Sequence, residues 1–115
     1  MNAPDELLID LINRTEIEGS GPRVTVVAHG TVITGRITPQ QEWAARIAER
    51  LRDLDPEAER FAEDFEREAA EPRAYPPVFL HLRDCLVLSG ARALPEPFGE
   101  VFRVSLQAVS AWGVR

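Results

Sequence analysis

Two stretches of strand-like apolar residues, separated by a long polar stretch, dominate the hydrophobic pattern of the chain. The first covers residues 24–38 and reads VTVVAHGTVITGRIT, and the second covers residues 78–115. Both are rich in β-branched residues and are broken by Gly, which is typical of strands joined by turns. Residues 39–70 are rich in Arg, Glu and Ala, with apolar residues at helical spacing. The pattern therefore predicts a small β-sheet interrupted by helices.

The first stretch predicts a β-hairpin over residues 24–38. His29-Gly30 supplies a tight turn, because Gly adopts a positive φ at little cost. Gly35 lies in the middle of the second strand, where a Gly often marks a bend, a bulge or the corner of a barrel. A curved pair of strands is expected.

Helices are predicted before the hairpin and after it. Residues 1–14 carry Leu and Ile on one stripe and form an N-terminal helix. Thr38-Pro39 begins a helical insertion over residues 39–70, with Thr38 as the cap and Gln41 closing a capping box. Asp55-Pro56 begins its second helix, which runs to about Ala70. The Pro-rich residues 71–77 form a stiff connector.

Residues 78–115 predict the closing strands. Residues 78–82 and 85–88 form two strands or one long strand bent near Arg83-Asp84, and residues 89–99 form a loop. Strands over residues 101–106 and 109–114 follow. The fold class is α+β in a single domain, residues 1–115. A small, strongly bent antiparallel sheet or barrel of about five strands carries the N-terminal helix and the two-helix insertion between strands 2 and 3.

Composition narrows the class of partner. The net charge is −6, and all 13 basic residues are Arg. An acidic chain argues against a broad phosphate-binding surface, although a local cluster of arginines stays open until the fold is known. No apolar run reaches the ~20 residues of a membrane span, and the N-terminal residues are acidic, unlike a signal peptide. A cytoplasmic protein is expected.

The sequence contains no catalytic or metal-binding motif, and no cofactor is expected. The lone cysteine, Cys85, lies in an apolar strand and fits a reducing compartment, so we expect it to be buried and inert. His81 and Asp84 lie close to it in sequence, but strand alternation puts His81 and Asp84 on opposite faces. Both are expected to have structural roles.

The second helix of the insertion has a charged face with two interpretations. It is either a solvated surface or an acidic docking surface for a partner, centred on Glu59, Glu63, Glu66 and Arg67.

The strand stretches resemble the gas vesicle accessory proteins of the U family. VTVVAHGTVITGRITPQQEW is similar to the opening hairpin of that family, with a Gly turn and entry to a helix at an aromatic residue. FLHLRDCLVLSG is similar to its aromatic-apolar-His-Leu-basic strand, and EVFRVSLQAVSAWGVR to its final strands. Val104-Ser105 and Ala111-Trp112 depart from the family pattern. The similar runs cover about half of the chain.

The resemblance implies a non-enzymatic protein that binds gas vesicle shell proteins or other accessory proteins and aids the assembly, stabilisation or clustering of vesicles. It would be cytoplasmic and associated with gas vesicles. Free edges of the sheet can add a neighbour's strand, which predicts self-association into a dimer or a ring.

The same stretches also resemble a small Sm-like barrel, which leaves an Sm-like RNA-binding oligomer as the alternative function. Phe79 and Val104 stand near positions where Sm proteins carry RNA-reading residues, so the barrel is expected without the RNA site. A small enzyme on a barrel is a further alternative and needs a concave polar pocket. An interior filled by apolar side chains would oppose it, and the residues expected there are Val26, Ile33, Leu82, Val104 and Trp112.

Overall fold

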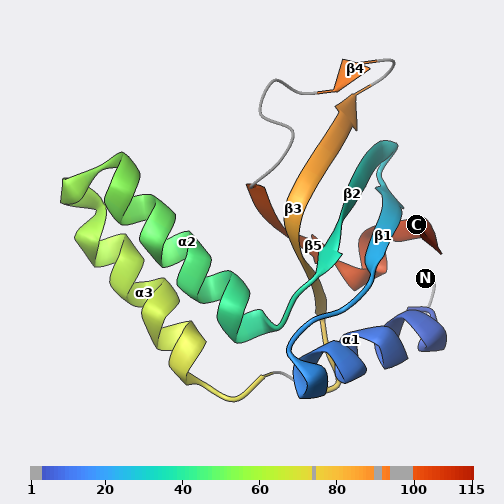
Figure 1. Ribbon diagram of the computed structural model, residues 1–115, viewed down its shortest axis with the longest axis horizontal. Coiled ribbons are helices and arrows are strands. Elements are labelled where there is room, and N and C mark those ends of the chain that lie inside the picture. Colours follow the sequence, from blue (N-terminus) through green and yellow to red (C-terminus); the bar gives the residue numbers. More distant parts are fainter. Residues whose placement is uncertain (1–3, 74, 90–91, 94–99) are drawn as a thin grey trace.

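The structure, a computed structural model, describes residues 4–73, 75–89, 92–93 and 100–115. It is an α+β fold, as predicted (Figure 1). In chain order the elements are α1 (Glu6–Glu18), β1 (Arg23–Ala28), β2 (Thr31–Ile37), α2 (Gln40–Leu54), the 3₁₀ helix η1 (Pro56–Ala58), α3 (Glu59–Ala70), β3 (Phe79–Ser89), β4 (Arg92–Ala93), β5 (Glu100–Ser105), the 3₁₀ helix η2 (Leu106–Ala108) and β6 (Val109–Val114). Most of the loop predicted over residues 89–99 lies outside the described residues. None of the described helices has the length and apolar content that a membrane crossing requires.

The strands form one antiparallel sheet in the order β4–β3–β2–β1–β6, and β5 also pairs with β3. β3 has 11 residues, enough to pair with β5 along its first part and with the short β4 at its end. Among the described residues no ladder joins β5 to β6, so these two strands lie at open edges. The antiparallel sheet is therefore confirmed, whereas the sheet is not closed into a barrel.

Two backbone irregularities shape the sheet. His29 and Gly30 have φ values of 50° and 80°, and this two-residue turn joins Ala28 to Thr31, as predicted for the hairpin. Asp84 has a φ of 52° where the pairing of β3 with β5 shifts register, between Leu82 and Cys85. β3 is thus one long strand with a bulge rather than two strands, and the bulge adds to its bend.

The N-terminal helix differs from the predicted residues 1–14. The carboxylate of Asp5 caps α1 by accepting from the Leu7 amide at 2.8 Å, and the helix then continues to Glu18. Thr15 is buried and its hydroxyl donates to the Leu11 carbonyl within the helix. The helix therefore continues past position 14, although the residues there are mostly polar. Gly19, with a φ of 85°, ends the helix because its left-handed conformation costs a Gly little.

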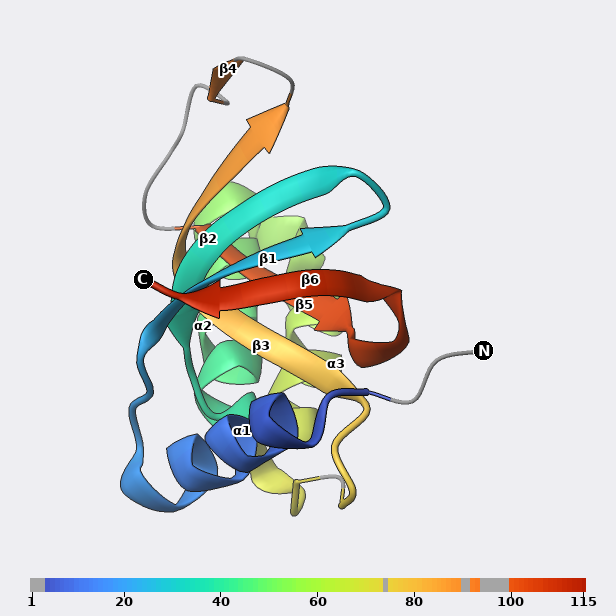
Figure 2. The ribbon, with the colours of Figure 1, turned by 90° about the vertical axis from the view of Figure 1, so that its right-hand side faces the viewer.

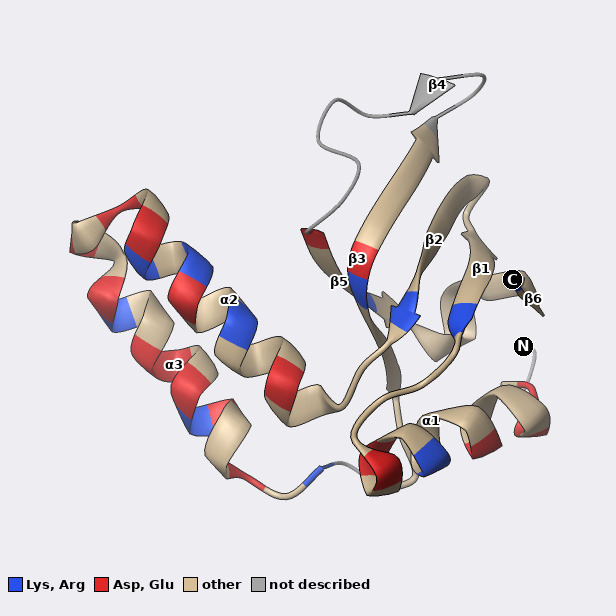
Figure 3. Cartoon of the chain, in the orientation of Figure 1, with Lys and Arg blue, Asp and Glu red and all other residues tan. Residues whose placement is uncertain are grey.

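The helical insertion lies between β2 and β3, as predicted, and forms an antiparallel hairpin of α2 and α3 that projects from the sheet (Figure 1). Charged positions of both signs run along the two helices (Figure 3). The predicted cap is wrong, because Pro39 occupies the N-cap and the Thr38 hydroxyl donates to Glu42 instead. The Gln40 amide donates to the Glu16 carboxylate of α1 at 2.7 Å. One helix therefore supplies the cap of another, a contact that local sequence does not contain.

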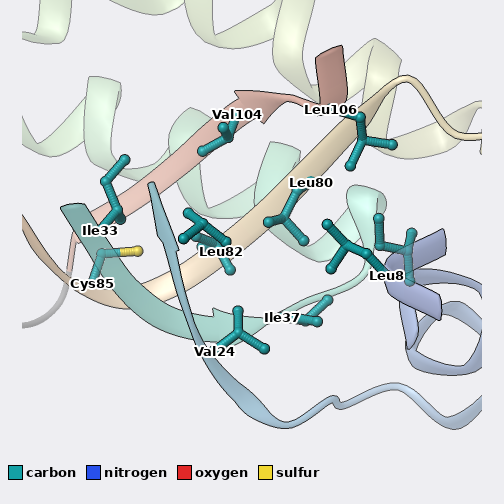
Figure 4. Close-up of a cluster of buried hydrophobic side chains, with 11 residues drawn as sticks. Leu8, Val24, Ile33, Ile37, Leu80, Leu82, Cys85, Val104 and Leu106 are labelled. Carbon is teal, nitrogen blue, oxygen red and sulfur yellow. The ribbon is translucent and has the colours of Figure 1, made fainter. Parts of the chain in front are cut away.

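The hydrophobic core lies between the sheet and α1 (Figures 2 and 4). Alternate residues of β1, β2, β3 and β5 point into it, and α1 covers it with Leu8 and Ile12. Its buried members are Leu8, Ile12, Val24, Val26, Ile33, Ile37, Leu80, Leu82, Cys85, Val104 and Leu106. Four of the five predicted interior residues are buried, and Trp112 is only partly buried against the core. An apolar filling of this interior opposes the barrel-enzyme alternative.

Gly35 provides a test of how closely β2 and β3 pack. A Cβ at Gly35 would lie 2.7 Å from the Cys85 Sγ and 3.1 Å from the Leu82 Cβ. We expect Gly35→Ala to lower the free energy of unfolding by about 1–3 kcal/mol, because overpacking displaces the neighbouring strand. Urea unfolding followed by circular dichroism measures the change. Gly113→Ala is the matched control, since a Cβ there meets nothing within 4 Å. Equal stability of both variants would contradict the close packing.

Candidate functional site

The predicted docking surface on α3 is exposed, and part of it is used to hold the helical hairpin together. Arg52 of α2 donates to both carboxylate oxygens of Glu59, at 2.8 and 3.1 Å, and also pairs with Glu66. Hydrogen bonds from Arg52 hold the pKa of Glu59 and of Glu66 below the usual range, and in turn raise the pKa of Arg52. Two of the predicted residues are therefore already ion-paired within the hairpin, where they share one arginine.

The other two predicted residues are open to solvent. Arg67 pairs with Asp64 at 3.1 Å, and the side chains of both are more than 60% exposed. Glu63 is exposed, and none of the ion pairs within the described part of the chain includes it. α3 thus brings all four residues onto its solvent side, with Glu63 as the carboxylate available to a partner.

The tip of the helical hairpin carries two exposed apolar side chains. Leu54, at the end of α2, is 72% exposed, and Phe61, near the start of α3, is 64% exposed. α3 carries two phenylalanines, Phe61 and Phe65. Only Phe65 packs inward, with its ring 5.9 Å from that of Trp43. Exposed apolar residues within a charged rim are typical of protein interfaces.

The root of the hairpin is held on the sheet by one arginine, Arg103 of β5. Its guanidinium lies 4.2 Å from the centre of the Trp43 ring and 4.6 Å from that of Phe79. Its Nε donates to His81 Nε2 at 2.9 Å, and its Nη2 pairs with Glu68 of α3. We call Arg103, Trp43, Phe79, His81 and Glu68 the Arg103 cluster. It joins α2, α3, β3 and β5 at one point.

His81 is a neutral member of this cluster. It is 4% exposed, and burial followed by the charge of Arg103 lowers its pKa to about 3. Its Nε2 accepts from Arg103, so the proton of the neutral ring is on Nδ1. Strand pairing places His81 directly opposite Arg103. The structural role expected for His81 holds, but its partner is 22 residues away, and no local pattern points to it.

A cavity of about 190 Å³ adjoins the Arg103 cluster, where α1, α2 and α3 meet β3 and β5. The charged residues in its wall have partners: Glu16 accepts from Gln40, Glu68 pairs with Arg103, and Arg73 donates to Asn13 at 2.6 Å. Each of these charged side chains in the cavity wall is therefore engaged by another part of the fold. The cavity is a junction between elements, and its geometry does not assemble a nucleophile with a base.

The other candidate groups in the same region do not converge either. Cys85 is buried as expected, and burial raises the pKa of its thiol to about 12. Asp84 pairs with Arg83 at the bulge. Cys85 points into the core and His81 lies on the opposite face of β3, because the bulge at Asp84 shifts the alternation between them. Within the described residues, no group of three or more His, Cys, Asp or Glu side chains has the geometry of a metal site.

The sheet offers two further surfaces. β6 and β5 are its edge strands. Beside β6 runs an apolar groove along α1, with Leu7, Leu11 and Ile17 on one side and Trp112 and Val114 on the other. Edge strands and apolar grooves both favour contact with protein rather than with a small molecule.

The buried state of His81 gives a pH dependence. The folded chain resists protonation of His81 down to pH 3, whereas the unfolded chain takes up the proton near pH 6.5. Stability is therefore present above pH 6.5 and is lost as the pH falls toward 3. Between pH 7.5 and pH 5 we expect the wild type to lose about 2 kcal/mol more than His81→Gln, whose amide oxygen can accept from Arg103.

Urea unfolding at the two pH values measures this difference. His29→Asn is the control, because His29 is exposed in the hairpin turn and Asn tolerates its positive φ. A pH dependence of His81→Gln equal to that of the wild type would show that His81 is not kept neutral.

One comparison with known proteins identifies a relative. The model of a family described as gas vesicle protein GvpU-like matches residues 5–114. No curated protein and no solved structure matches the chain.

Proposed function

Since the chain belongs to the GvpU-like family of gas vesicle proteins, we propose that it is a non-enzymatic accessory protein that binds gas vesicle shell proteins or other accessory proteins. The observation that carries the proposal is the family match over residues 5–114, which covers nearly the whole chain. Binding aids the assembly, stabilisation or clustering of vesicles. The protein acts by surface recognition, with no cofactor.

The solvent side of α3 is the proposed partner surface. Glu59, Glu63, Glu66 and Arg67 lie there, and Glu63 is the carboxylate without an ion pair in the described part of the chain. Because Arg52 ties Glu59 and Glu66 to α2, the surface is presented by a braced pair of helices rather than by a single mobile one. Such preorganisation lowers the entropy cost of binding.

The open sheet edges support self-association as the second part of the proposal. β5 and β6 end the sheet on opposite sides, so β5 of one copy can pair with β6 of another. A contact between two different edges is heterologous and generates a ring if the rotation closes. The order of β1, β2, β3, β5 and β6 in the sheet, with η2 between the last two strands, is compatible with an Sm-like arrangement that stays open in one copy.

Co-flotation tests the vesicle contact. Purified gas vesicles rise in water, so a protein bound to them collects in the buoyant layer. We expect the wild type to co-float and Glu63→Arg to bind about tenfold more weakly, because an attractive charge contact becomes repulsive. Glu18→Arg, at the exposed end of α1, makes the same charge change away from α3 and is the control. Wild-type protein that stays in the lower layer would refute vesicle binding.

Mass measurement tests the self-association. We expect light scattering to give an average mass that rises with concentration above the 12.8 kDa of one chain. A monomeric mass from micromolar to near-millimolar protein would rule out pairing of edges.

A further inference from the structure

Three arginines lie side by side across three neighbouring strands. Strand pairing sets Arg23 of β1 opposite Arg36 of β2, and Arg36 opposite Arg83 of β3. We call these residues the arginine row. The basic positions of β1, β2 and β3 appear at the same level of the sheet (Figure 3).

The arginine row faces away from the core. Each arginine is next in sequence to a fully buried core residue, namely Val24, Ile37 or Leu82. Because successive side chains of a strand point to opposite faces, the arginines lie on the face opposite α1. On the same face, the next pair along β2 and β3 is Thr34 with Leu86, and both residues are partly exposed. The row therefore borders a stretch of sheet that is accessible to a partner.

The central arginine is the most unusual of the three. Like charges directly opposite each other in a sheet are destabilising, and Arg36 has an arginine on both sides. Its Nη1 donates to the carbonyl of Gly21 at 3.0 Å, a neutral group, and among the ion pairs of the described residues Asp84 is the carboxylate at the row. A guanidinium has five N–H donors, so Arg36 keeps donors for a further acceptor. In a chain of net charge −6, this grouping favours an anionic partner.

The chain itself contains a segment of matching chemistry. Residues 53–64 form the tip of the helical hairpin and hold six carboxylates and one Arg. The same segment includes Leu54 and Phe61. Both apolar side chains are mostly exposed. Guanidinium groups bind carboxylates and also stack on aromatic rings. The Arg103 cluster shows that stacking within this fold, since Arg103 lies between two rings.

We propose that the arginine row of one copy receives the hairpin tip of a second copy, with carboxylates such as Glu57 on the guanidiniums and Phe61 stacked against them. The tip projects away from β1 and β2 of its own copy (Figure 1), so the contact is between copies. This contact joins two different surfaces. A chain of copies therefore keeps a free row at one end and a free tip at the other, and further copies can add there. The contact deepens the self-association in the proposed function, and it does not use the sheet edges.

The experiment uses two variants that each remove one side of the contact. Arg36→Glu reverses the centre of the arginine row, and Phe61→Ala removes the ring at the tip. In sedimentation velocity we expect each variant to raise the dissociation constant of this contact about tenfold or more. Arg14→Glu, an exposed arginine of α1, makes the same charge change and is expected to match the wild type. Circular dichroism confirms that all variants are folded.

Mixing the two variants supplies the decisive result. Arg36→Glu keeps an intact tip and Phe61→Ala keeps an intact row, so an equimolar mixture is expected to form a one-to-one complex that neither variant forms alone. Wild-type behaviour of Arg36→Glu, or no complex in the mixture, would overturn the proposal. Arg36→Glu could instead lose vesicle co-flotation, or lose binding to single-stranded RNA, while its self-association is unchanged. Either result would assign the arginine row to another partner and would also overturn the proposal. Self-association through row and tip without co-flotation would refute the vesicle contact alone.

Discussion

The position of the helical insertion depends on the contacts of a single guanidinium. Arg103 stands on an edge strand and meets an imidazole, two aromatic rings and a carboxylate that come from three other elements. A half-buried cation gains from contact with aromatic faces, and its N–H groups also need acceptors where water is excluded. Here His81 and the carboxylate of Glu68 accept them together. The neutral state of His81 is thus part of the fold.

The strands, the turn at His29-Gly30 and the existence of two helices between β2 and β3 could be predicted from periodicity and turn residues, because these depend on near neighbours in sequence. Contacts between distant residues could not. Glu16 caps the helix that begins at Gln40, and Arg103 lies opposite His81, although nothing in the local sequence distinguishes either residue from other charged ones. Composition left open a local cluster of arginines, and only strand register shows where one lies.

The candidate surface on α3 also has a part that could be predicted from the sequence and a part that could not. An acidic face on α3 follows from spacing alone, and the four residues chosen for it do share the solvent side of the helix. Their separate roles depend on Arg52, which lies on another helix and pairs with Glu59 and Glu66 but not with Glu63. Phe61 and Phe65 lie four residues apart on α3, and their spacing does not reveal that Phe65 packs against Trp43 whereas Phe61 is exposed at the tip.

The braced hairpin also has a mechanical consequence. α2 has 15 residues and is therefore about 22 Å long. Arg52 fastens its far end to α3, while the Arg103 cluster fastens its near end to the sheet. Such an arm transmits a pull at its tip to its root as torque, and the ion pair between Arg50 and Glu100 carries part of that load to the start of β5. A load applied at the tip of this arm therefore strains β5, an outer strand of the sheet, before it reaches the central strands.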